Sequence, residues 1–210
     1  MTAAEIFQYV EQEIHSTIMA TVDEQGQPVT CAIDIMDADG TSLYFLTAKG
    51  KGFYRRLKAQ GFVAFTGMKG KDTLSCVAVS IRGKVREIGQ ARLSRLLEKN
   101  PYMYQIYSTP ESRQALTVFQ IYQGEGEWFD LSKKPIQRFS FSFGQPLSTF
   151  GEEYHITSAC TGCHECETAC PQRCIDFTGG LPHIRQEHCL HCGNCQAVCP
   201  VGAVERGREV

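Results

Sequence analysis

The sequence lacks several features that would each assign the protein to a familiar class. No apolar run approaches the roughly 20 residues that a membrane-spanning helix needs, since stretches such as Leu43–Leu46 and Phe62–Phe65 are much shorter. The N-terminus, MTAAEIFQYVEQE, has no basic-then-apolar pattern of a secretory signal. The net charge of −2 offers no broad basic field to nucleic acid or an anionic membrane. These absences predict a cytoplasmic protein that binds neither nucleic acid nor membrane.

Nucleotide-binding motifs are missing as well. No G-x-G-x-x-G follows an expected strand, because the segment GKGFYR at 50–55 breaks the pattern at its last position. The sequence also contains no P-loop and no G-x-S-x-G. A dedicated Rossmann domain for NAD is therefore not expected.

Cysteine is scarce over most of the chain and abundant at its end. Only Cys31 and Cys76 precede residue 160, whereas the other nine of the 11 cysteines lie at 160–199. Lysine is absent after residue 150. Between the two compositions lies FGQPLSTFG at 143–151, which is rich in residues that break regular structure. We predict one domain at 1–145, a linker at 146–152 and a second domain at 153–210.

The second domain contains an internal repeat of a four-cysteine run. In a reducing compartment, thiols at such short spacing indicate metal binding rather than disulfides. Each run has the spacing C-x2-C-x2-C-x3-C-P, and the second follows the first after 29 residues. This spacing is typical of bacterial ferredoxins with two [4Fe–4S] clusters. The runs are Cys160, Cys163, Cys166 and Cys170, and then Cys189, Cys192, Cys195 and Cys199.

The spacing also predicts which cysteines share a cluster. Three cysteines at i, i+3 and i+6 can point at three corners of one cubane, whereas the fourth lies too far along and reaches the other cluster. One cluster is therefore expected on Cys160, Cys163, Cys166 and Cys199, and the other on Cys189, Cys192, Cys195 and Cys170. The alternative is structural zinc, but zinc sites use two cysteine pairs separated by a longer loop. The repeat favours iron and sulfide, and hence one-electron transfer.

Cys174 is a ninth cysteine that this scheme does not require. It aligns in the repeat with Ala203, so that position accepts a small residue beside the cluster. We interpret Cys174 as a small buried side chain rather than a ligand, although it is a substitute should a ligand be lost. The nearby histidines are not expected to bind iron, because the cysteine set is complete.

The first domain has the patterns of a mainly β, α+β fold. Apolar stripes at Ile6–Ile14, Phe53–Leu57 and Leu93–Leu97 predict helices. Alternating or compact apolar runs predict a small antiparallel barrel with these helices at its periphery. The expected strands are Ser16–Val22, Val29–Met36, Ser42–Thr47, Phe62–Thr66, Val77–Val85, Leu116–Tyr122 and Phe139–Phe143.

One stretch of this domain resembles a known family. The string ATVDEQGQPVTCAIDIMDADGTSLYFLTAKGKGFYRRLKAQGFVAFTG, with RGKVREI and GEWFDLS further on, is similar to the pyridoxamine 5′-phosphate oxidase-like FMN-binding split barrels. The similarity runs from Ile14 to about Asp130. It implies an antiparallel split barrel, FMN as cofactor and a homodimer with FMN at its interface.

The resemblance also implies positions for the flavin. Thr47 and Lys51, with Lys49 as a further candidate, fall where the family contacts the FMN phosphate, and their glycine-containing loop opens a helix whose free N–H groups favour an anion. The alternative is a solvated basic turn followed by the helix charges Arg55, Arg56 and Lys58. The strand segment Thr30, Cys31, Ala32 and Ile33 matches the family segment along the isoalloxazine edge. Typical members carry arginine near the Cys31 position, and this departure argues against a true pyridoxamine-phosphate oxidase.

The two domains together predict an FMN-dependent oxidoreductase. Electrons would pass between two [4Fe–4S] clusters and FMN, with ferredoxin or a similar redox protein as partner and an unidentified small-molecule acceptor. Oxygen-sensitive clusters suggest an anaerobic host. The alternatives are an electron carrier or redox-sensing module without its own substrate, and a barrel that binds deazaflavin or haem. The sequence nominates no side chain as general acid or base.

Overall fold

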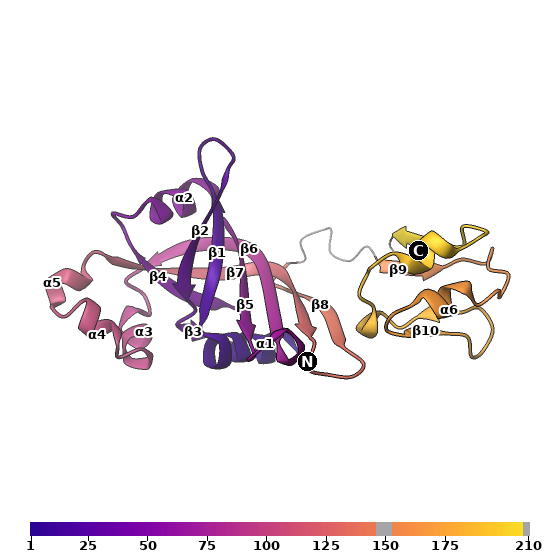
Figure 1. The fold of residues 1–210 in the computed structure, drawn as a ribbon. Coiled ribbons are helices and arrows are strands. Elements are labelled where there is room, and N and C mark those ends of the chain that lie inside the picture. Colours follow the sequence, from indigo (N-terminus) through magenta and orange to yellow (C-terminus); the bar gives the residue numbers. More distant parts are fainter. Residues whose placement is uncertain (146–152, 208–210) are drawn as a thin grey trace. The chain divides into compact units, whose positions relative to one another are not determined.

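The computed structural model describes residues 1–145 and 153–207 and is dominated by one curled antiparallel sheet (Figure 1). The strand order is β2-β1-β5-β6-β7-β4-β3, and β8 pairs with β7. The order makes β2 an edge strand, because it pairs with β1 alone. The strands of this sheet are β1 (Ser16–Val22), β2 (Pro28–Asp34), β3 (Asp37–Ala38), β4 (Leu43–Ala48), β5 (Phe62–Lys69), β6 (Val77–Gly89), β7 (Leu116–Asp130) and β8 (Gln137–Phe143).

The chain divides into two compact units. The first contains most of the sheet, and the second contains the cysteine-rich module together with segments 71–77 and 128–140. The predicted linker at 146–152 lies outside the described residues. No helix within the described ranges is long and apolar enough to cross a membrane.

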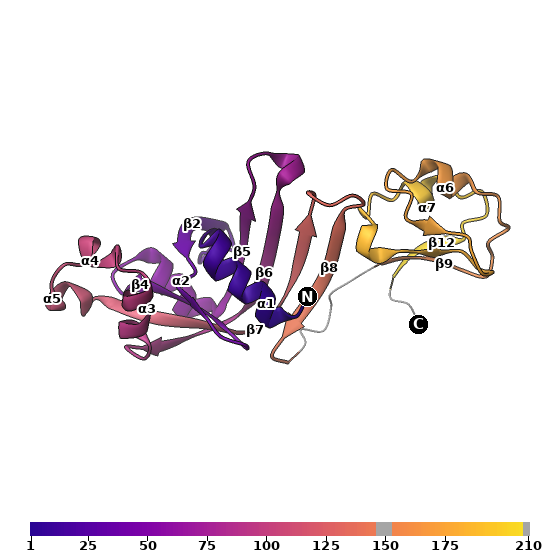
Figure 2. The same cartoon turned by 90° about the horizontal axis from the view of Figure 1, so that it is seen from below.

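Helices of three kinds accompany the strands. In both views α3, α4 and α5 lie together beside one end of β4 (Figures 1 and 2). The α-helices are α1 (Ala3–Tyr9), α2 (Gly52–Gln60), α3 (Leu93–Lys99), α4 (Met103–Ile106), α5 (Pro110–Arg113), α6 (Glu165–Ala169) and α7 (Asn194–Val198). A π-helix, η1 (Val10–Ile14), continues α1, and η2 (Thr73–Ser75) and η3 (Gln186–His188) are 3₁₀ turns.

Local sequence accounts for the ends of these helices. Thr2 and Glu5 form a reciprocal capping box that satisfies two backbone N–H groups where α1 begins. Gly61, with φ of 61°, ends α2 in the left-handed conformation that glycine adopts without steric cost. Pro110 follows the capping residue Thr109 at the start of α5, where a missing N–H does no harm.

The β1–β2 hairpin is set by its turn. The Asp23 carboxylate accepts hydrogen bonds from the backbone N–H groups of Gln25 and Gln27, at 3.0 and 2.8 Å. The resulting register pairs Met19 with Cys31. Alternate residues of β1 are buried, as expected for a strand with one face against the core.

The core of the sheet is apolar and aromatic. The rings of Phe45 and Phe119 stack with centroids 5.7 Å apart, and both side chains are buried. Phe7 of α1 meets Phe143 of β8 edge to face at 4.8 Å, which fixes the first helix to the sheet. Burial of each such side chain contributes roughly 1.5–3 kcal/mol.

Strands β6 and β7 approach so closely that only glycine fits at their crossing. A Cβ atom added at Gly124 would lie 2.4 Å from the Arg82 carbonyl oxygen, and one at Gly83 would lie 2.5 Å from the Gln123 carbonyl oxygen. These glycines therefore maintain the backbone approach in the middle of the sheet.

We expect Gly124→Ala to destabilise the protein by about 1–3 kcal/mol, because the new methyl group would force the two strands apart. The shift in the midpoint of thermal unfolding measures the effect. Gly40→Ala is the matched control, since nothing lies within 4 Å of its Cβ position. Equal midpoints for the two variants would contradict the close crossing.

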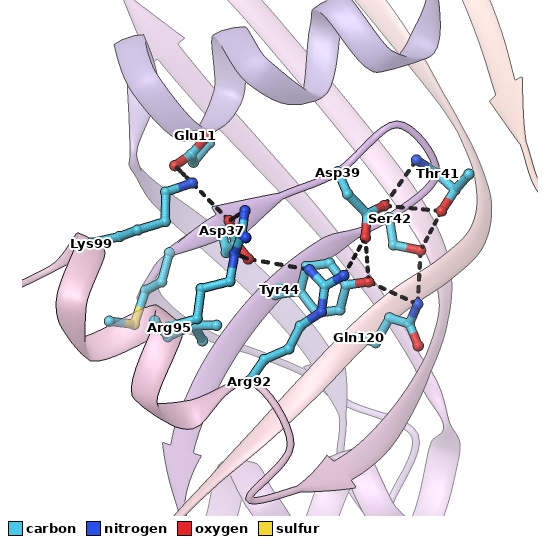
Figure 3. A network of polar contacts seen from close by, with 12 residues as sticks. Glu11, Asp37, Asp39, Thr41, Ser42, Tyr44, Arg92, Arg95, Lys99 and Gln120 are labelled. Carbon is cyan, nitrogen blue, oxygen red and sulfur yellow. Dashed lines mark hydrogen bonds and ion pairs between the residues drawn. The ribbon is translucent and has the colours of Figure 1, made fainter.

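A polar network fixes α3 to the sheet (Figure 3). The Asp37 side chain is fully buried and contacts Arg95 Nε and Lys99 Nζ at 2.7 Å each and Arg92 Nη1 at 3.2 Å. Arg92 Nη2 also reaches Asp39 Oδ2 at 2.8 Å. Three cations thus meet three carboxylates, and we call this set the Asp37 network: Glu11, Asp37, Asp39, Arg92, Arg95 and Lys99.

The cysteine-rich module contains two short two-stranded antiparallel sheets. Strand β9 (Glu153–Ile156) pairs with β12 (Val204–Gly207), and β10 (Ile175–Asp176) pairs with β11 (His183–Ile184). Its small core buries Ile175 and Val204, the two residues that the repeat places in register.

The repeat preserves backbone conformation where it does not preserve the residue. Gly162 and His191 occupy equivalent positions with φ of 70° and 54°, and His164 and Gly193 do so with φ of 63° and 78°. The backbone at each of these positions has the left-handed conformation, which only glycine adopts freely. Each run therefore carries one histidine and one glycine at these two positions, in opposite order.

The expected elements are found, but several differ in extent, and β3 is not among the expected strands. Strand β7 continues to Asp130 rather than ending near Tyr122, because the glycines of the segment GEGE serve the strand crossing instead of breaking the strand. Helices α4 and α5 were not expected, since four residues are too few to show a helical period. The first helical stripe divides into α1 and η1.

Candidate functional site

Two similar hollows in the second unit are lined by the predicted ligand cysteines. The first is lined by Cys160, Cys163, Cys166 and Cys199. The second is lined by Cys170, Cys189, Cys192 and Cys195. The fourth cysteine of each run thus lies with the first three of the other run.

Short loops and helices direct these thiols inward. The backbone N–H of Gly162 donates to Cys160 Sγ at 3.4 Å, and that of His191 donates to Cys189 Sγ at the same distance. The N–H of Ala203 donates to Cys199 Sγ at 3.2 Å. Donors aimed at sulfur favour the thiolate form, and thiolates are the ligands that iron–sulfur clusters require. The donor set therefore fits a cluster in each hollow.

Cys174 lies in the wall of the second hollow. Its side chain is buried, and its Sγ is 3.5 Å from Cys170 Sγ. A hydrogen bond with Cys189 lowers the pKa of Cys189 to about 6 and raises the pKa of Cys174. Cys174 thus remains a thiol that donates toward a thiolate. This is the small buried side chain predicted from its alignment with Ala203.

The cysteines are spread too widely for a single ion. Among residues 1–145 and 153–207, no three His, Cys, Asp or Glu side chains converge tightly enough to hold one metal ion. A zinc site needs four ligand atoms at about 2.0–2.3 Å from one centre. Four thiols around an empty space suit a multi-atom cluster better than an ion.

A second candidate site surrounds the N-terminus of α2. Lys51 is the N-cap residue and provides no side-chain cap, so the first N–H groups of the helix remain available to an anion. Lys49 and Lys51 are exposed beside this end. Thr47 ends the preceding strand with its side chain buried.

Two arginines, interpreted from sequence only as helix charges, complete this basic end. A Cβ atom added at Gly52 would lie 3.2 Å from Arg56 Nη1 and 3.7 Å from Arg55 Nη2, so both guanidinium groups fold back over the first turn. Arg56 Nε also donates to Thr21 Oγ1 at 2.7 Å, which fixes its orientation. The sequence indicated this arrangement only through the i, i+4 spacing of Gly52 and Arg56, which places both residues on the same face of the helix.

Strand β2 approaches the same basic end. Burial raises the pKa of Cys31, and the nearby positive charges of Arg56 and Lys51 oppose that rise. Cys31 and Ile33 point to the half-buried side of the strand, whereas Thr30 and Ala32 are exposed. Because β2 is an edge strand, its outer backbone groups are free to hydrogen-bond a planar heterocycle. The structure therefore brings the predicted strand segment and the predicted phosphate loop to one place.

The Thr47 hydroxyl is a feature of this site that the protein does not satisfy. Its Oγ1 is buried and, within the described part of the chain, has no hydrogen-bond partner. An unsatisfied buried hydroxyl costs about 1–3 kcal/mol. This orphaned group, the uncapped helix end and the four basic side chains all fit a phosphate-bearing cofactor.

The arrangement corresponds to a known family. The family model described as pyridoxamine 5′-phosphate oxidase matches residues 4–127. The chain belongs to the pyridoxamine 5′-phosphate oxidase family. A second model, the 4Fe-4S dicluster domain, matches residues 159–203 of this family member.

Individual relatives match one part or the other. A solved NimC/NimA family protein from Clostridium acetobutylicum superposes on 65% of the oxidase-family chain and 90% of its own, with a TM-score of 0.53 and 20% identity, which shows the fold. The 7Fe ferredoxin of Hydrogenibacillus schlegelii is 40% identical over 53 residues, covering 24% of this chain and 68% of that protein.

A third relative is much longer than the matched segment. It is a component of the ion-translocating oxidoreductase complex of Methanosarcina acetivorans, and it is 48% identical over 46 residues, or 22% of this chain. The match spans only 17% of that relative. The similarity therefore concerns the ferredoxin-type module of this oxidase-family protein.

Proposed function

We propose that the protein is an FMN-dependent oxidoreductase that passes electrons between two [4Fe–4S] clusters and FMN, and on to a small-molecule acceptor. The observation that carries the proposal is the presence, in one chain, of two four-cysteine hollows and of an uncapped basic helix end beside an edge strand. When bound, the clusters supply one-electron transfer and FMN supplies one- or two-electron transfer.

The residues have separate tasks in this proposal. The eight cysteines hold the clusters, and backbone N–H groups stabilise their thiolates. Thr47, Lys49, Lys51 and the N-terminus of α2 bind the phosphate. Thr30, Cys31, Ala32 and Ile33 hold the edge of the flavin ring along β2.

Arg56 takes the place of the arginine that typical members have near Cys31. The positive charge of Arg56 opposes the rise in the pKa of Cys31 that burial causes. The guanidinium group of Arg56 lies over the first turn of α2. In this proposal, Arg56 of α2 supplies the positive charge that an arginine of the strand supplies in typical members. The changed geometry supports an oxidoreductase other than a true pyridoxamine-phosphate oxidase.

The exposed face of the sheet supports a homodimer. Ile18 and Val22 on β1, with Phe62 and Met68 on β5, are large apolar side chains that remain exposed. Monomeric proteins seldom leave such a contiguous patch uncovered. A second copy of the chain would cover it, as the family resemblance implies. Ferredoxin or a similar redox protein is the proposed electron partner of the cysteine-rich module.

The phosphate site is tested by comparing FMN with riboflavin, which lacks the phosphate. We expect Lys51→Ala and Arg56→Ala each to weaken FMN binding at least tenfold, because a hydrogen bond to a charged group contributes about 1.5–3 kcal/mol. Riboflavin binding should remain unchanged in both variants. Calorimetric titration of the flavin-free protein measures both affinities.

Lys58→Ala is the matched control on the same helix. Lys58 Nζ pairs with Glu87 at 3.0 Å and therefore takes no part in the phosphate site. An equal loss of FMN and riboflavin affinity in the Lys51 and Arg56 variants would refute a phosphate role. Assay of iron, sulfide and flavin in an anaerobic preparation, followed by reductive titration, tests whether electrons redistribute between the cofactors.

A further inference from the structure

Three polar side chains meet where β2 ends. The Tyr102 hydroxyl donates to Asp34 Oδ2 at 2.7 Å and lies 3.0 Å from His15 Nε2. His15 Nε2 is itself 3.5 Å from Asp34 Oδ2. The side chains of His15 and Asp34 are about one-third exposed, so solvent or a small molecule can reach them. We call this group the His15 triad.

The hydrogen bonds of the triad select one tautomer of His15. Tyr102 has one hydroxyl hydrogen, which it gives to the Asp34 carboxylate, so its oxygen can only accept from the imidazole. The hydrogen therefore belongs on Nε2 of the neutral ring. Within the described residues, Nδ1 has no hydrogen-bond partner and is left to take up or release a proton. An acid that orients a histidine through a hydrogen bond is a recurring feature of proton-transfer sites.

The backbone of His15 is held in an unusual conformation. Its φ of 60° and ψ of −67° fall in the γ-turn region that is rare and strained for a residue with a side chain. Two backbone hydrogen bonds hold it there, to the Val10 carbonyl at 2.7 Å and from the Ile35 N–H at 2.8 Å. Strain of this kind costs about 1–3 kcal/mol and is concentrated at functional positions.

The surrounding elements fix the other two members. Ser16 of β1 donates to Asp34 Oδ1 at 2.6 Å, which leaves Oδ2 for the triad. Asn100 Nδ2 donates to the Met36 carbonyl at 2.9 Å, and this contact holds the segment that carries Tyr102. The neighbouring Asp37 network anchors α3 and is internally balanced, so it adds no unpaired charge (Figure 3). Burial, together with Asp34, raises the pKa of Tyr102, which therefore stays protonated.

We propose that His15, Tyr102 and Asp34 form a proton-transfer site for the acceptor of the flavin's electrons. The proposal rests on the proposed function, and it is located by Asp34, which directly follows the flavin segment of β2. Bound FMN, when reduced, would supply two electrons and one proton as a hydride equivalent, and the His15 imidazolium would supply the second proton, so that a quinone becomes a hydroquinone with one hydrogen on each carbonyl oxygen. Solvent then returns the proton to His15. The acceptor is therefore of a class that needs a proton with each hydride, such as a quinone.

The first test concerns the tautomer and needs no flavin. Nitrogen-15 NMR of the oxidised full chain is expected to show that the neutral form of the His15 ring carries its hydrogen on Nε2. In Tyr102→Phe the preference should be lost, because the phenol oxygen that accepts this hydrogen is gone. The proposal would be overturned if the neutral His15 ring of the wild type carried its hydrogen on Nδ1. It would also be overturned if the tautomer preference of His15 were the same in Tyr102→Phe as in the wild type.

The second test compares two chemical oxidants of the reduced holoprotein. Ferricyanide takes an electron without a proton, whereas 1,4-benzoquinone takes two electrons and two protons. We expect His15→Asn to slow reoxidation by benzoquinone about a hundredfold, which is the usual range of general acid catalysis, and to leave the ferricyanide rate unchanged. Asparagine is among the side chains found most often at positive φ, so this replacement should disturb the backbone of residue 15 least.

Tyr104→Phe is the matched control, since Tyr104 lies two residues from Tyr102 with its side chain exposed. Equal losses with both oxidants would indicate a structural role and overturn the proposal, as would an unchanged benzoquinone rate. A wild-type protein that binds no FMN would instead refute the proposed function at the loading step. The tautomer measurement would then decide on the triad alone.

Discussion

Replacement of Cys199 by alanine is expected to lower the iron content from about eight to about four atoms per chain. The cluster lost should be the one in the first hollow, because Cys199 lines that hollow with Cys166 and does not line the second hollow with Cys195. Loss of one thiolate from a four-thiolate site removes that cluster and leaves the other. Iron and sulfide analysis of anaerobically purified protein measures the change.

Two double variants test the crossing itself. Cys166→Ala combined with Cys199→Ala should retain about four irons, because both residues serve the same cluster. Cys195→Ala combined with Cys199→Ala should retain almost none, because one ligand is lost from each cluster. Cys174→Ala is the control and should keep about eight irons. The opposite pattern in the two double variants would show that each run holds its own cluster.

Replacement of Asp37 by asparagine is expected to destabilise the protein by about 3 kcal/mol. Removal of one partner from a buried ion pair costs about 3–5 kcal/mol, and the lower value applies here because the three cations are partly exposed. The midpoint of thermal unfolding should fall by about 6–12 °C, since each kcal/mol corresponds to roughly 2–4 °C at this size. Circular dichroism in the far ultraviolet follows the transition.

Asp39→Asn is the control within the same network. Its carboxylate is 30% exposed, so loss of its ion pair with Arg92 is expected to cost about 1 kcal/mol or less. The asparagine oxygen can still accept one of the hydrogen bonds that Tyr44 and Thr41 donate to Asp39. A midpoint for Asp37→Asn no lower than that of Asp39→Asn would show that the buried carboxylate does not anchor α3.

The same network predicts how stability depends on pH. Burial raises the pKa of Asp37, but hydrogen bonds from Arg95 and Lys99 outweigh it and hold that pKa below its ordinary value. A carboxyl group whose folded-state pKa is depressed stabilises the fold fully above the unfolded-state pKa and loses this effect as the pH falls through the folded-state value. The stabilisation should therefore be complete at neutral pH and decline as the pH falls below about 4, towards the lower folded-state pKa. In Asp37→Asn this part of the acid dependence should be absent.

The cysteine module could be predicted because its determinants are local. Spacings of two and three residues fix where thiols can point, and a second copy of the run supplies the other half of each site. The family resemblance similarly located Thr47 near the end of a strand and Lys51 at the start of the following helix. In these cases each residue lies close in sequence to the residues that position it.

The remaining features depend on contacts that no local pattern encodes. His15 and Tyr102 are 87 residues apart, and they meet because the Asp37 network anchors α3, which precedes Tyr102, to β3. Arg56 looked like one of several charges on a solvated helix, and its role emerges only when its guanidinium group is seen over the first turn. Asp37 gave no indication of burial, because its three cationic partners lie more than 50 residues further along the chain.

The exchange of histidine and glycine between the two cysteine runs has a consequence for the ancestry of the module. If one run arose as a copy of the other, the left-handed turns were inherited as shapes, while the residues that fill them diverged. As a result the first hollow has the His164 ring in its wall, stacked on Phe177 at 4.1 Å, whereas the second has Gly193 at the equivalent position. Two sites with the same ligands thus have different neighbours. The duplicated halves are no longer interchangeable, because the two cysteine sites differ in the side chains that surround them.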